Sequence, residues 1–588
     1  MREALQYPLD VPLLLRKRRA LKAELSAKGP FMRKKIALLG GSTTADLRSL
    51  LELFLLASGI EPVFFESEYN RFFEDGALGG SPLDELEPDV VVVHTTQRNV
   101  TRWPEASATP EQVDALLASE LGRFELLWKR LLSKFSCIVV QNNFDAPPLE
   151  VLGHLGSSAP SGHVRFVERL NAAFAEAARA EPRLRINDIA RLSAQVGLDE
   201  WASPSWWLNY KMAVSPAGAA RLAHQTAKII RAAYGRTKKC LVLDLDNTLW
   251  GGVIGDDGVD GLELGHETPR GEAFVAFQRY CLQLKSRGVL LAVCSKNDPA
   301  IARTGFLHPD SVLKVSDFAA FHASWDPKPE GLVAIAKQLN LGLDSLVFVD
   351  DNPFERELVA RTLPEVAVPK VSDPARYAEV VDREGHFEPF SITQDDAARA
   401  DQYAVEALRV EAQSRFQDYG EYLKWLEMKA EVAPFAPKYL DRIAQLINKT
   451  NQFNLTTSRH SLAEVTAFAK SPEHVTLYGR LSDRFGDHGL VSVIIAHALG
   501  EALHVDTWLM SCRVLKRDFE HAMFAALCEA AQKRGLVRLI GRYVPTPKNA
   551  MVAGHYESLG FTRLDDGTFS YELGKSPAPK NTPITRSP

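Results

Sequence analysis

The chain has little of several features that mark particular classes of protein. Its 588 residues include only six cysteines, none in a Cys-x-x-Cys pair, so no disulfide framework is indicated and a reduced, cytoplasmic protein is predicted. No apolar run approaches the ~20 residues that cross a bilayer. The apolar Val11–Leu15 is followed by four basic residues, the reverse of the order in a secretory signal. A net charge of −5 leaves no basic surplus, so neither nucleic acid nor a membrane is a predicted partner.

Strands that alternate with helices from Lys34 onward predict a multidomain α/β fold with parallel sheets. The length alone predicts roughly three to four domains. We expect α/β domains at 34–235 and 236–390 and an α+β domain at 428–575. The remaining segments are a helical or loose leader (1–33), a charged helical linker (391–427) and a tail rich in Pro, Lys and Thr (576–588), which we expect to be disordered.

Two aspartates two residues apart carry the sharpest chemical signal. Asp244 and Asp246 lie at the carboxyl end of a predicted buried strand that begins at Cys240, and open α/β sheets bind ligands at that end. One carboxylate can attack phosphorus to form an aspartyl phosphate. The second can protonate the leaving oxygen and then take a proton from water. We therefore predict Asp244 as the nucleophile and Asp246 as the acid/base.

Three further elements follow in the order that this chemistry needs. The strand 290–294 ends in Ser295, a hydroxyl suited to a phosphoryl oxygen, and Lys328 supplies a cation for the nucleophile and the pentavalent phosphorus. The strand 347–349 is followed by two acids that can complete an oxygen shell for Mg²⁺. The predicted metal ligands are Asp244, Asp246, Asp350 and Asp351, and Thr248 and Asn297 are predicted to bind substrate.

This order of motifs resembles the haloacid dehalogenase superfamily over about residues 238–389, and the resemblance implies a Rossmann-like phosphatase domain. The intervals between the motifs leave room for only a minimal cap, the flap 250–265. An uncapped site is open to water and to bulky substrates. The lid is therefore expected to be a neighbouring domain or a carrier protein.

Residues 428–575 resemble the GNAT N-acyltransferases, most clearly in the Tyr-x-x-x-Gly-Phe sequence at 556–561. In that family a glycine-rich loop holds the coenzyme A pyrophosphate at a helix N-terminus. Here Lys516 and Asp518 stand where glycines are expected, which argues against acetyl coenzyme A as a cofactor.

Cys512 follows the predicted strand 503–510, beside Arg513 and a helix N-terminus, which would lower the pKa of its thiol. We predict that Cys512 holds an acyl group as a thioester, with His488 as its base and Arg513 at the substrate. The alternatives are a small buried hydrophobic residue and a solvated or structural histidine. The amide-rich stretch 448–457, with Asn451 and Asn454, is predicted to bind a polyol or pantetheine, or else to form turns and caps.

The domain at 34–235 resembles the SGNH hydrolases. This resemblance predicts a flavodoxin-like sheet. Ser42 stands at the nucleophile position, and glycine and asparagine residues stand at those of the oxyanion donors. The Asp-x-x-His-Pro sequence of that family is replaced by Met212–Pro216, which holds neither the acid nor the base. Since Ser42 then lacks its usual activation, we predict a non-hydrolytic scaffold or docking domain.

Four long motifs together resemble the FkbH-like proteins: those at 244–253, 347–356, 452–457 and 508–515. The resemblance implies an enzyme that takes the phosphoglyceryl unit of 1,3-bisphosphoglycerate, removes its phosphate and loads a glyceryl thioester onto the phosphopantetheine arm of an acyl carrier protein for polyketide assembly. Two alternatives remain. A plain Mg²⁺-dependent phosphatase would need only residues 236–390, and a glyceryl or acyl transferase acting on an amino sugar in surface-polysaccharide assembly would also fit.

Overall fold

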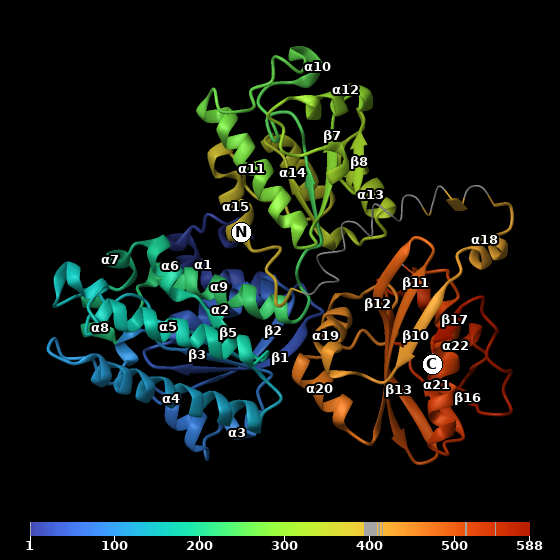
Figure 1. Cartoon of the computed structure of the whole chain (residues 1–588), viewed down its shortest axis with the longest axis horizontal. Coiled ribbons are helices and arrows are strands. Elements are labelled where there is room, and N and C mark those ends of the chain that lie inside the picture. The colour runs from blue at the N-terminus through green and yellow to red at the C-terminus, as the bar shows by residue number, and fades with distance from the viewer. Residues whose placement is uncertain are drawn as a thin grey trace. The chain divides into compact units, whose positions relative to one another are not determined.

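The computed structural model describes residues 2–392, 409, 412–413, 416–511, 514–546 and 548–587. Three β-sheets lie within these residues (Figure 1). The chain divides into two compact units, residues 1–233 with 461–464, and residues 234–460 with 465–588. The first unit holds one sheet and the second unit holds two. None of the described helices is long and apolar enough to span a membrane.

The sheet of the first unit is wholly parallel, in the order β2-β1-β3-β4-β5. Val90–Val93 of β3 are buried, as expected of a continuous apolar run covered on both faces. The order is that of flavodoxin-like sheets, in which ligands bind at the carboxyl ends where the strand order reverses, here between β1 and β3. The strands are β1 Met32–Gly40, β2 Ile60–Glu66, β3 Val90–His94, β4 Ile138–Asn142 and β5 Leu184–Asn187.

The leader is a packed helix and is not loose. α1 (Val11–Ser26) buries Leu14, Leu21 and Leu25 and contacts α2 (Ala45–Ala57), where Arg18 lies 2.7 Å from Asp46. The other helices of this unit are α3 Leu83–Leu86, α4 Pro110–Lys134, α5 His163–Ala180, α6 Ile189–Val196, α7 Leu198–Trp201, α8 Pro204–Tyr210 and α9 Pro216–Ala233.

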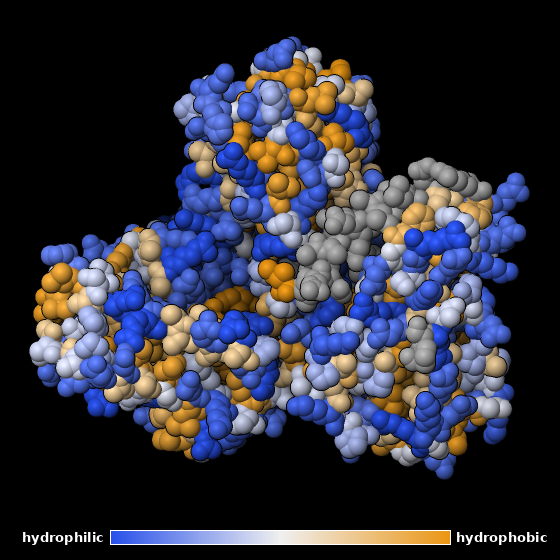
Figure 2. All heavy atoms as spheres, in the orientation of Figure 1, coloured by the Kyte–Doolittle hydropathy of each residue, from blue (hydrophilic) through white to orange (hydrophobic). Residues whose placement is uncertain are grey.

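The second unit begins with a four-stranded parallel sheet in the order β8-β7-β6-β9. β6 and β9 are fully buried. Their apolar packing fixes the position of the polar residues that follow them. The region around this four-stranded sheet shows apolar side chains among hydrophilic ones on the face seen in Figure 2. The elements are β6 Cys240–Leu243, β7 Leu290–Ser295, β8 Ala320–Ala323, β9 Leu346–Val349, α10 Ile254–Asp257, α11 Pro269–Ser286, α12 Pro299–Thr304, α13 Lys328–Gln338, α14 Pro353–Thr362 and α15 Tyr377–Glu384.

The third sheet has eight strands in the order β15-β16-β14-β13-β12-β11-β10-β17. Most neighbours are antiparallel, but β13 pairs with β14 in parallel and only through Ala502–Val505. The strands are β10 Lys429–Ala433, β11 His474–Asp483, β12 Gly486–Leu499, β13 Ala502–Met510, β14 Arg538–Gly541, β15 Thr562–Arg563, β16 Phe569–Glu572 and β17 Thr585–Ser587. The helices are α18 Tyr419–Trp425, α19 Leu440–Lys449, α20 Leu462–Lys470, α21 Phe519–Lys533 and α22 His555–Ser558.

The prediction of a disordered tail is wrong for its last residues. Thr585–Ser587 form β17, which pairs in parallel with β10. Ile584 is buried, and Arg586 lies 2.7 Å from Glu529 of α21, so an apolar anchor and an ion pair hold the edge strand in place. Most of the predicted helical linker 391–427 lies outside the described residues, which include α18 at its end.

Candidate active site

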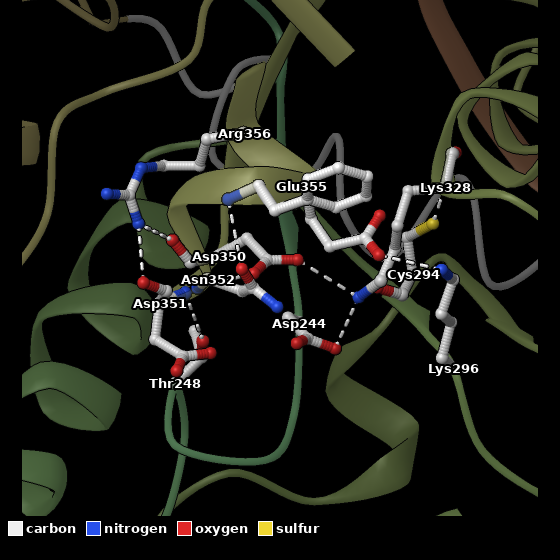
Figure 3. Close-up of polar contacts among 11 residues, drawn as sticks. Asp244, Thr248, Cys294, Lys296, Lys328, Asp350, Asp351, Asn352, Glu355 and Arg356 are labelled. Carbon is white, nitrogen blue, oxygen red and sulfur yellow. Dashed lines mark hydrogen bonds and ion pairs between the residues drawn. The ribbon is translucent and has the colours of Figure 1, made fainter. Parts of the chain in front are cut away.

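Four loops at the carboxyl edge of the sheet β8-β7-β6-β9 bring together the predicted phosphotransfer residues (Figure 3). Asp244 follows β6, Ser295 ends β7, and Asp350 follows β9. Lys328 begins α13, five residues after β8. Because all four strands are parallel, residues separated by more than 100 positions meet at one edge.

Lys328 lies between two of the acids. Its Nζ is 2.6 Å from Asp244 Oδ1 and 3.1 Å from Asp350 Oδ2, and it also donates to the carbonyl oxygen of Cys294 (2.9 Å). The side chain of Lys328 is buried, which disfavours its charge, but the neighbouring charges of Asp244 and Asp350 outweigh burial and raise its pKa. Lys328 is therefore a fixed cation directed at the carboxylate of Asp244.

Three acids form a group that could hold a metal ion. Carboxylate oxygens of Asp244, Asp350 and Asp351 all lie within 4.8 Å of one another. Burial, followed by the charge of Asp244, raises the pKa of Asp350 to about 7. Three carboxylates facing one lysine leave a surplus of negative charge, and oxygen ligands of this kind suit Mg²⁺. The donor set fits the predicted metal.

Asp246 is held apart from this group. Its Oδ1 accepts hydrogen bonds from Trp250 Nε1 (2.9 Å) and the Ile254 backbone (3.0 Å), and its Oδ2 accepts from Asn297 Nδ2 (3.0 Å). Among the described residues the structure does not bring its carboxylate into the metal group. Burial raises the pKa of Asp246, which suits a carboxyl group that must carry a proton.

Of the remaining predicted residues of this site, Thr248 and Asn297 position others. Thr248 is buried and its Oγ1 accepts from the backbone N–H of Asp351 (3.2 Å). The side-chain amide of Asn297 donates a hydrogen bond to Asp246, as described above. Ser295 is buried at the end of β7, and the chain turns after it into α12.

Two residues at the start of α14 were not predicted as part of the site. Arg356 donates from one nitrogen to the carbonyl oxygens of Asp350 (2.7 Å) and Asp351 (2.6 Å), and Glu355 lies 2.7 Å from Lys296. Arg356 thus fixes the backbone that carries both acids. A signal was present in the sequence, because both residues end the motif at 347–356 that also contains the two acids.

The flap 250–265 is small. It contains α10 and a bridge between Gly251 and Glu263. Between β6 and β7, where every residue is described, α10 and α11 are the helices present, so no cap domain is inserted there. The large apolar residues Val253, Trp325 and Phe354, each in or next to a loop of this edge, are exposed.

In the C-terminal sheet, His488 belongs to a buried ionic cluster. Its Nε2 lies 2.9 Å from Asp483 Oδ2, and Arg409 and Arg517 contact the same carboxylate at 2.8 Å and 2.9 Å. Burial opposes the charge of Asp483, but hydrogen bonds from His488 and Arg409 lower its pKa well below the usual range. Burial also lowers the pKa of His488. Cys512, for which His488 was the predicted base, and Arg513 lie outside the described residues.

The two predicted amide residues have different surroundings. Asn454 is fully buried: its Nδ2 donates to the Thr450 carbonyl (3.2 Å) and its Oδ1 accepts from the backbone of Thr457 (2.8 Å). The structure therefore gives Asn454 the turn-forming role that was the alternative. Asn451 accepts from Arg459 and lines a cavity described below.

In the first unit, Ser42 contacts a histidine that sequence analysis missed. Ser42 Oγ lies 3.1 Å from Nε2 of His94, the last residue of β3. The prediction that Ser42 lacks its usual activation considered only residues 212–216 and missed this histidine. Both side chains are buried, and burial lowers the pKa of His94 to about 4.

A chain of hydrogen bonds fixes which ring nitrogen of His94 carries the proton. Thr226 donates to Leu222 and accepts from Asn187 Nδ2 (3.1 Å), which also donates to Asn142 Oδ1 (2.9 Å). Asn142 thus turns its Nδ2 towards His94 Nδ1, at 2.9 Å. Since Nδ1 accepts, the proton sits on Nε2, which donates to Ser42. A neutral histidine in this tautomer cannot take the proton of Ser42.

We expect Ser42→Ala to leave phosphate release and acyl loading almost unchanged, and the wild type to lack esterase activity. The physical reason is the tautomer of His94, which makes it a donor to Ser42. Hydrolysis of a p-nitrophenyl ester by the wild type that vanishes in Ser42→Ala would contradict this. Asn142→Asp is the informative comparison, because a carboxylate would accept from Nδ1 and move the ring proton there, which nitrogen NMR of His94 would detect.

Comparison with known proteins gives three findings. Residues 35–231 match the FkbH N-terminal domain, and no curated protein matches the chain. The N-terminal part of protein BF1531 from Bacteroides fragilis, which contains a phosphatase domain and was crystallised with Mg, shares 31% identity and a TM-score of 0.59 over 64% of this chain and 98% of that one.

Two acetyltransferases also align with part of the chain. The Escherichia coli ribosomal-protein-S18-alanine N-acetyltransferase aligns at 12% identity and a TM-score of 0.20, over 26% of this chain and 99% of that one. The GNAT domain of S. lividans PAT aligns at 15% identity and a TM-score of 0.21, over 24% of this chain and 89% of that one. The chain therefore carries an FkbH N-terminal domain at residues 35–231 and belongs to the same family as BF1531, whose N-terminal part contains a phosphatase domain.

Proposed function

We propose that this chain is a Mg²⁺-dependent phosphatase of the haloacid dehalogenase type that uses Asp244 as its nucleophile. One observation supports this most strongly: the carboxylate of Asp244 lies 2.6 Å from the buried Lys328, at the same sheet edge as Asp246, Asp350 and Asp351. Lys328 can stabilise the negative charge that develops on the phosphoryl oxygens.

The protein's own residues account for the proton transfers. Asp244 attacks phosphorus and the bond from phosphorus to the leaving oxygen breaks, which leaves an aspartyl phosphate. Asp246 gives its proton to the leaving oxygen and then takes one from the water that hydrolyses the phosphoenzyme. Trp250, Ile254 and Asn297 hold the Asp246 carboxylate in place for both steps.

Asp244, Asp350 and Asp351 would hold the metal ion. When bound, Mg²⁺ offsets negative charge on the carboxylates and the phosphoryl group. Arg356 holds the backbone of both later acids, so the ligands are positioned before substrate arrives.

The proposed substrate is the phosphoglyceryl unit of 1,3-bisphosphoglycerate, and the proposed acceptor is the phosphopantetheine thiol of an acyl carrier protein, in the cytoplasm. The acyl phosphate end is an activated carbonyl, whereas the other end is a phosphate ester whose leaving oxygen needs the proton of Asp246. A small flap suits this pairing, because the site is open to a bulky substrate.

The test is incubation of the whole chain with 1,3-bisphosphoglycerate, Mg²⁺ and candidate carrier proteins, read by intact mass. We expect a carrier heavier by one glyceryl group together with release of phosphate. Phosphate release without any adduct on a carrier or on the chain would reduce the function to that of a plain phosphatase. Transfer to an amino sugar instead of a carrier would identify a different acceptor.

Asp246→Asn should lower turnover by roughly 10²–10⁴-fold, the usual effect of losing a general acid and base. The nucleophile Asp244 is retained, so phosphoenzyme should accumulate because water is no longer deprotonated. The measurement is intact mass after acid quench, together with phosphate release. If Asp246→Asn turned over as fast as the wild type, the acid/base assignment would be wrong.

A further inference from the structure

A cavity of about 420 Å³ lies at the opposite edge of the phosphatase sheet from Asp244. Its wall includes Lys239, Leu290 and Ser345, which stand at the amino ends of β6, β7 and β9. The rest of the wall comes from residues 340–344, Glu365, α19, residues 450–453, Ser511 and Lys548. A volume of this size is within the range of small-molecule sites, roughly 300–1,000 Å³.

One wall of the cavity is held in place by backbone pairing. β13 loses its partner β14 after Val505, and the segment 453–455 takes the vacated edge: Leu455 donates to Trp508 (3.0 Å) and Met510 donates to Phe453 (3.0 Å). Asn549, fully buried, donates to the carbonyl oxygen of Asn454 (2.9 Å) from the other side. The amide-rich stretch therefore forms a rigid wall beside Ser511.

The chemistry of the lining suits a ligand with one anionic end and a partly apolar chain. Among the described residues that line the cavity, the four basic residues Lys239, Arg442, Lys449 and Lys548 outnumber the two acids, Asp344 and Glu365, and Lys548 forms an ion pair with Asp344. Leucines and Phe453 supply apolar surface, and Thr450, Asn451 and Gln452 supply groups that can pair with amides. A phosphate at the cationic side with an amide-containing chain beside it would match every part of this lining.

The position separates this cavity from the phosphatase site. β6 is four residues long, which at about 3.3 Å per residue separates the two edges of the sheet by about 13 Å. The cavity and the Asp244 carboxylate therefore lie at opposite edges of the sheet, so variants of the cavity lining can be tested separately from phosphotransfer.

We propose that this cavity binds a phosphopantetheine chain and directs its thiol end towards Ser511. The inference rests on the proposed function, because it identifies where the acceptor arm enters. The same chain occurs in coenzyme A and on carrier proteins. Binding of the free chain therefore tests the cavity, and competition by each of the two larger molecules distinguishes the sources.

The experiment is calorimetric titration of the whole chain with free phosphopantetheine, in the Asp244→Asn background so that the phosphate is not removed. Lys449→Glu and Lys548→Gln should each weaken binding by about tenfold, because each removes a cation from the anionic end of the ligand. Lys337→Glu, an exposed lysine of α13 that does not line the cavity, is the matched control and should bind normally. Pantetheine without its phosphate should bind more weakly and respond little to either variant.

This inference would be overturned if phosphopantetheine bound both cavity variants as tightly as it binds the protein with the wild-type cavity. It would also be overturned if the protein with the wild-type cavity did not bind phosphopantetheine. Phosphate release from a simple ester, measured with Asp244 intact, should be unchanged by Lys449→Glu and Lys548→Gln. Failure at the cavity with normal phosphate release would leave the proposed phosphatase standing. Loss of phosphate release together with normal phosphopantetheine binding would exclude the proposed phosphatase and leave the proposed binding cavity standing.

Discussion

Asp244→Asn should abolish phosphate release while the protein stays folded. An amide is nearly the same size as the carboxylate but cannot attack phosphorus, and loss of a covalent nucleophile costs on the order of 10⁴–10⁶-fold in turnover. The measurement is phosphate release from a phosphate ester in Mg²⁺. Wild-type release by the variant would exclude Asp244 as the nucleophile.

The same substitution should not destabilise the fold. Burial and then the charge of Asp244 raise the pKa of Asp350. Removal of the Asp244 charge therefore relieves the electrostatic repulsion between two buried acids. Lys328 retains Asp350 as a partner at 3.1 Å. We therefore expect an unchanged or higher Tm without metal. The control is Asp310→Asn, an exposed aspartate outside the site, which should release phosphate normally.

The phosphotransfer site was predictable because its residues follow strands whose apolar character is clear in the sequence. Asp244, Ser295 and Asp350 each stand at the end of a buried run, and parallel strands carry such ends to one edge. The side-chain directions were not predictable. Asp246 was predicted to bind metal, but its carboxylate is hydrogen-bonded to Trp250 and Asn297, contacts that depend on how the flap folds back.

Contacts between distant residues explain the other differences. The Ser42–His94 pair joins residues 52 positions apart, and His94 ends an apolar run without any local pattern that marks a functional histidine. β17 was missed because polar residues rich in Pro and Lys give no strand signal, and its pairing depends on the free edge of β10. The ionic cluster of His488 includes Asp483, only five residues away, but also Arg517, which is 29 residues away in the sequence.

The largest effect expected in the acyl transfer is that of Cys512→Ser. In our proposal the Cys512 thiolate attacks the carbonyl carbon of the acyl phosphate, the bond to the phosphate oxygen breaks, and phosphate leaves with the electron pair. The pantetheine thiol then gives up its proton and attacks the thioester carbonyl, and the Cys512 thiolate leaves. A serine hydroxyl is far less ionised than a thiol at neutral pH, so carrier loading should be lost.

The residue before Cys512 is compatible with this role. Ser511, the residue before it, lines the cavity proposed for the pantetheine chain. Phosphate release from a simple ester should persist in Cys512→Ser, because Asp244 belongs to a different sheet. The matched control is Cys528→Ser on α21. Burial raises the pKa of the Cys528 thiol to about 12, which keeps it protonated, so its loss should leave loading intact.

Intact mass provides the direct measurement. After exposure to the acyl phosphate donor, the wild type and Cys528→Ser should carry an adduct of glyceryl or phosphoglyceryl size that hydroxylamine removes and that maps to the peptide around Cys512. Cys512→Ser should carry none. If Cys512→Ser loaded a carrier at the normal rate, no covalent relay would be needed. Direct attack of the carrier thiol on the donor, with both held at the C-terminal sheet, would then be the better account.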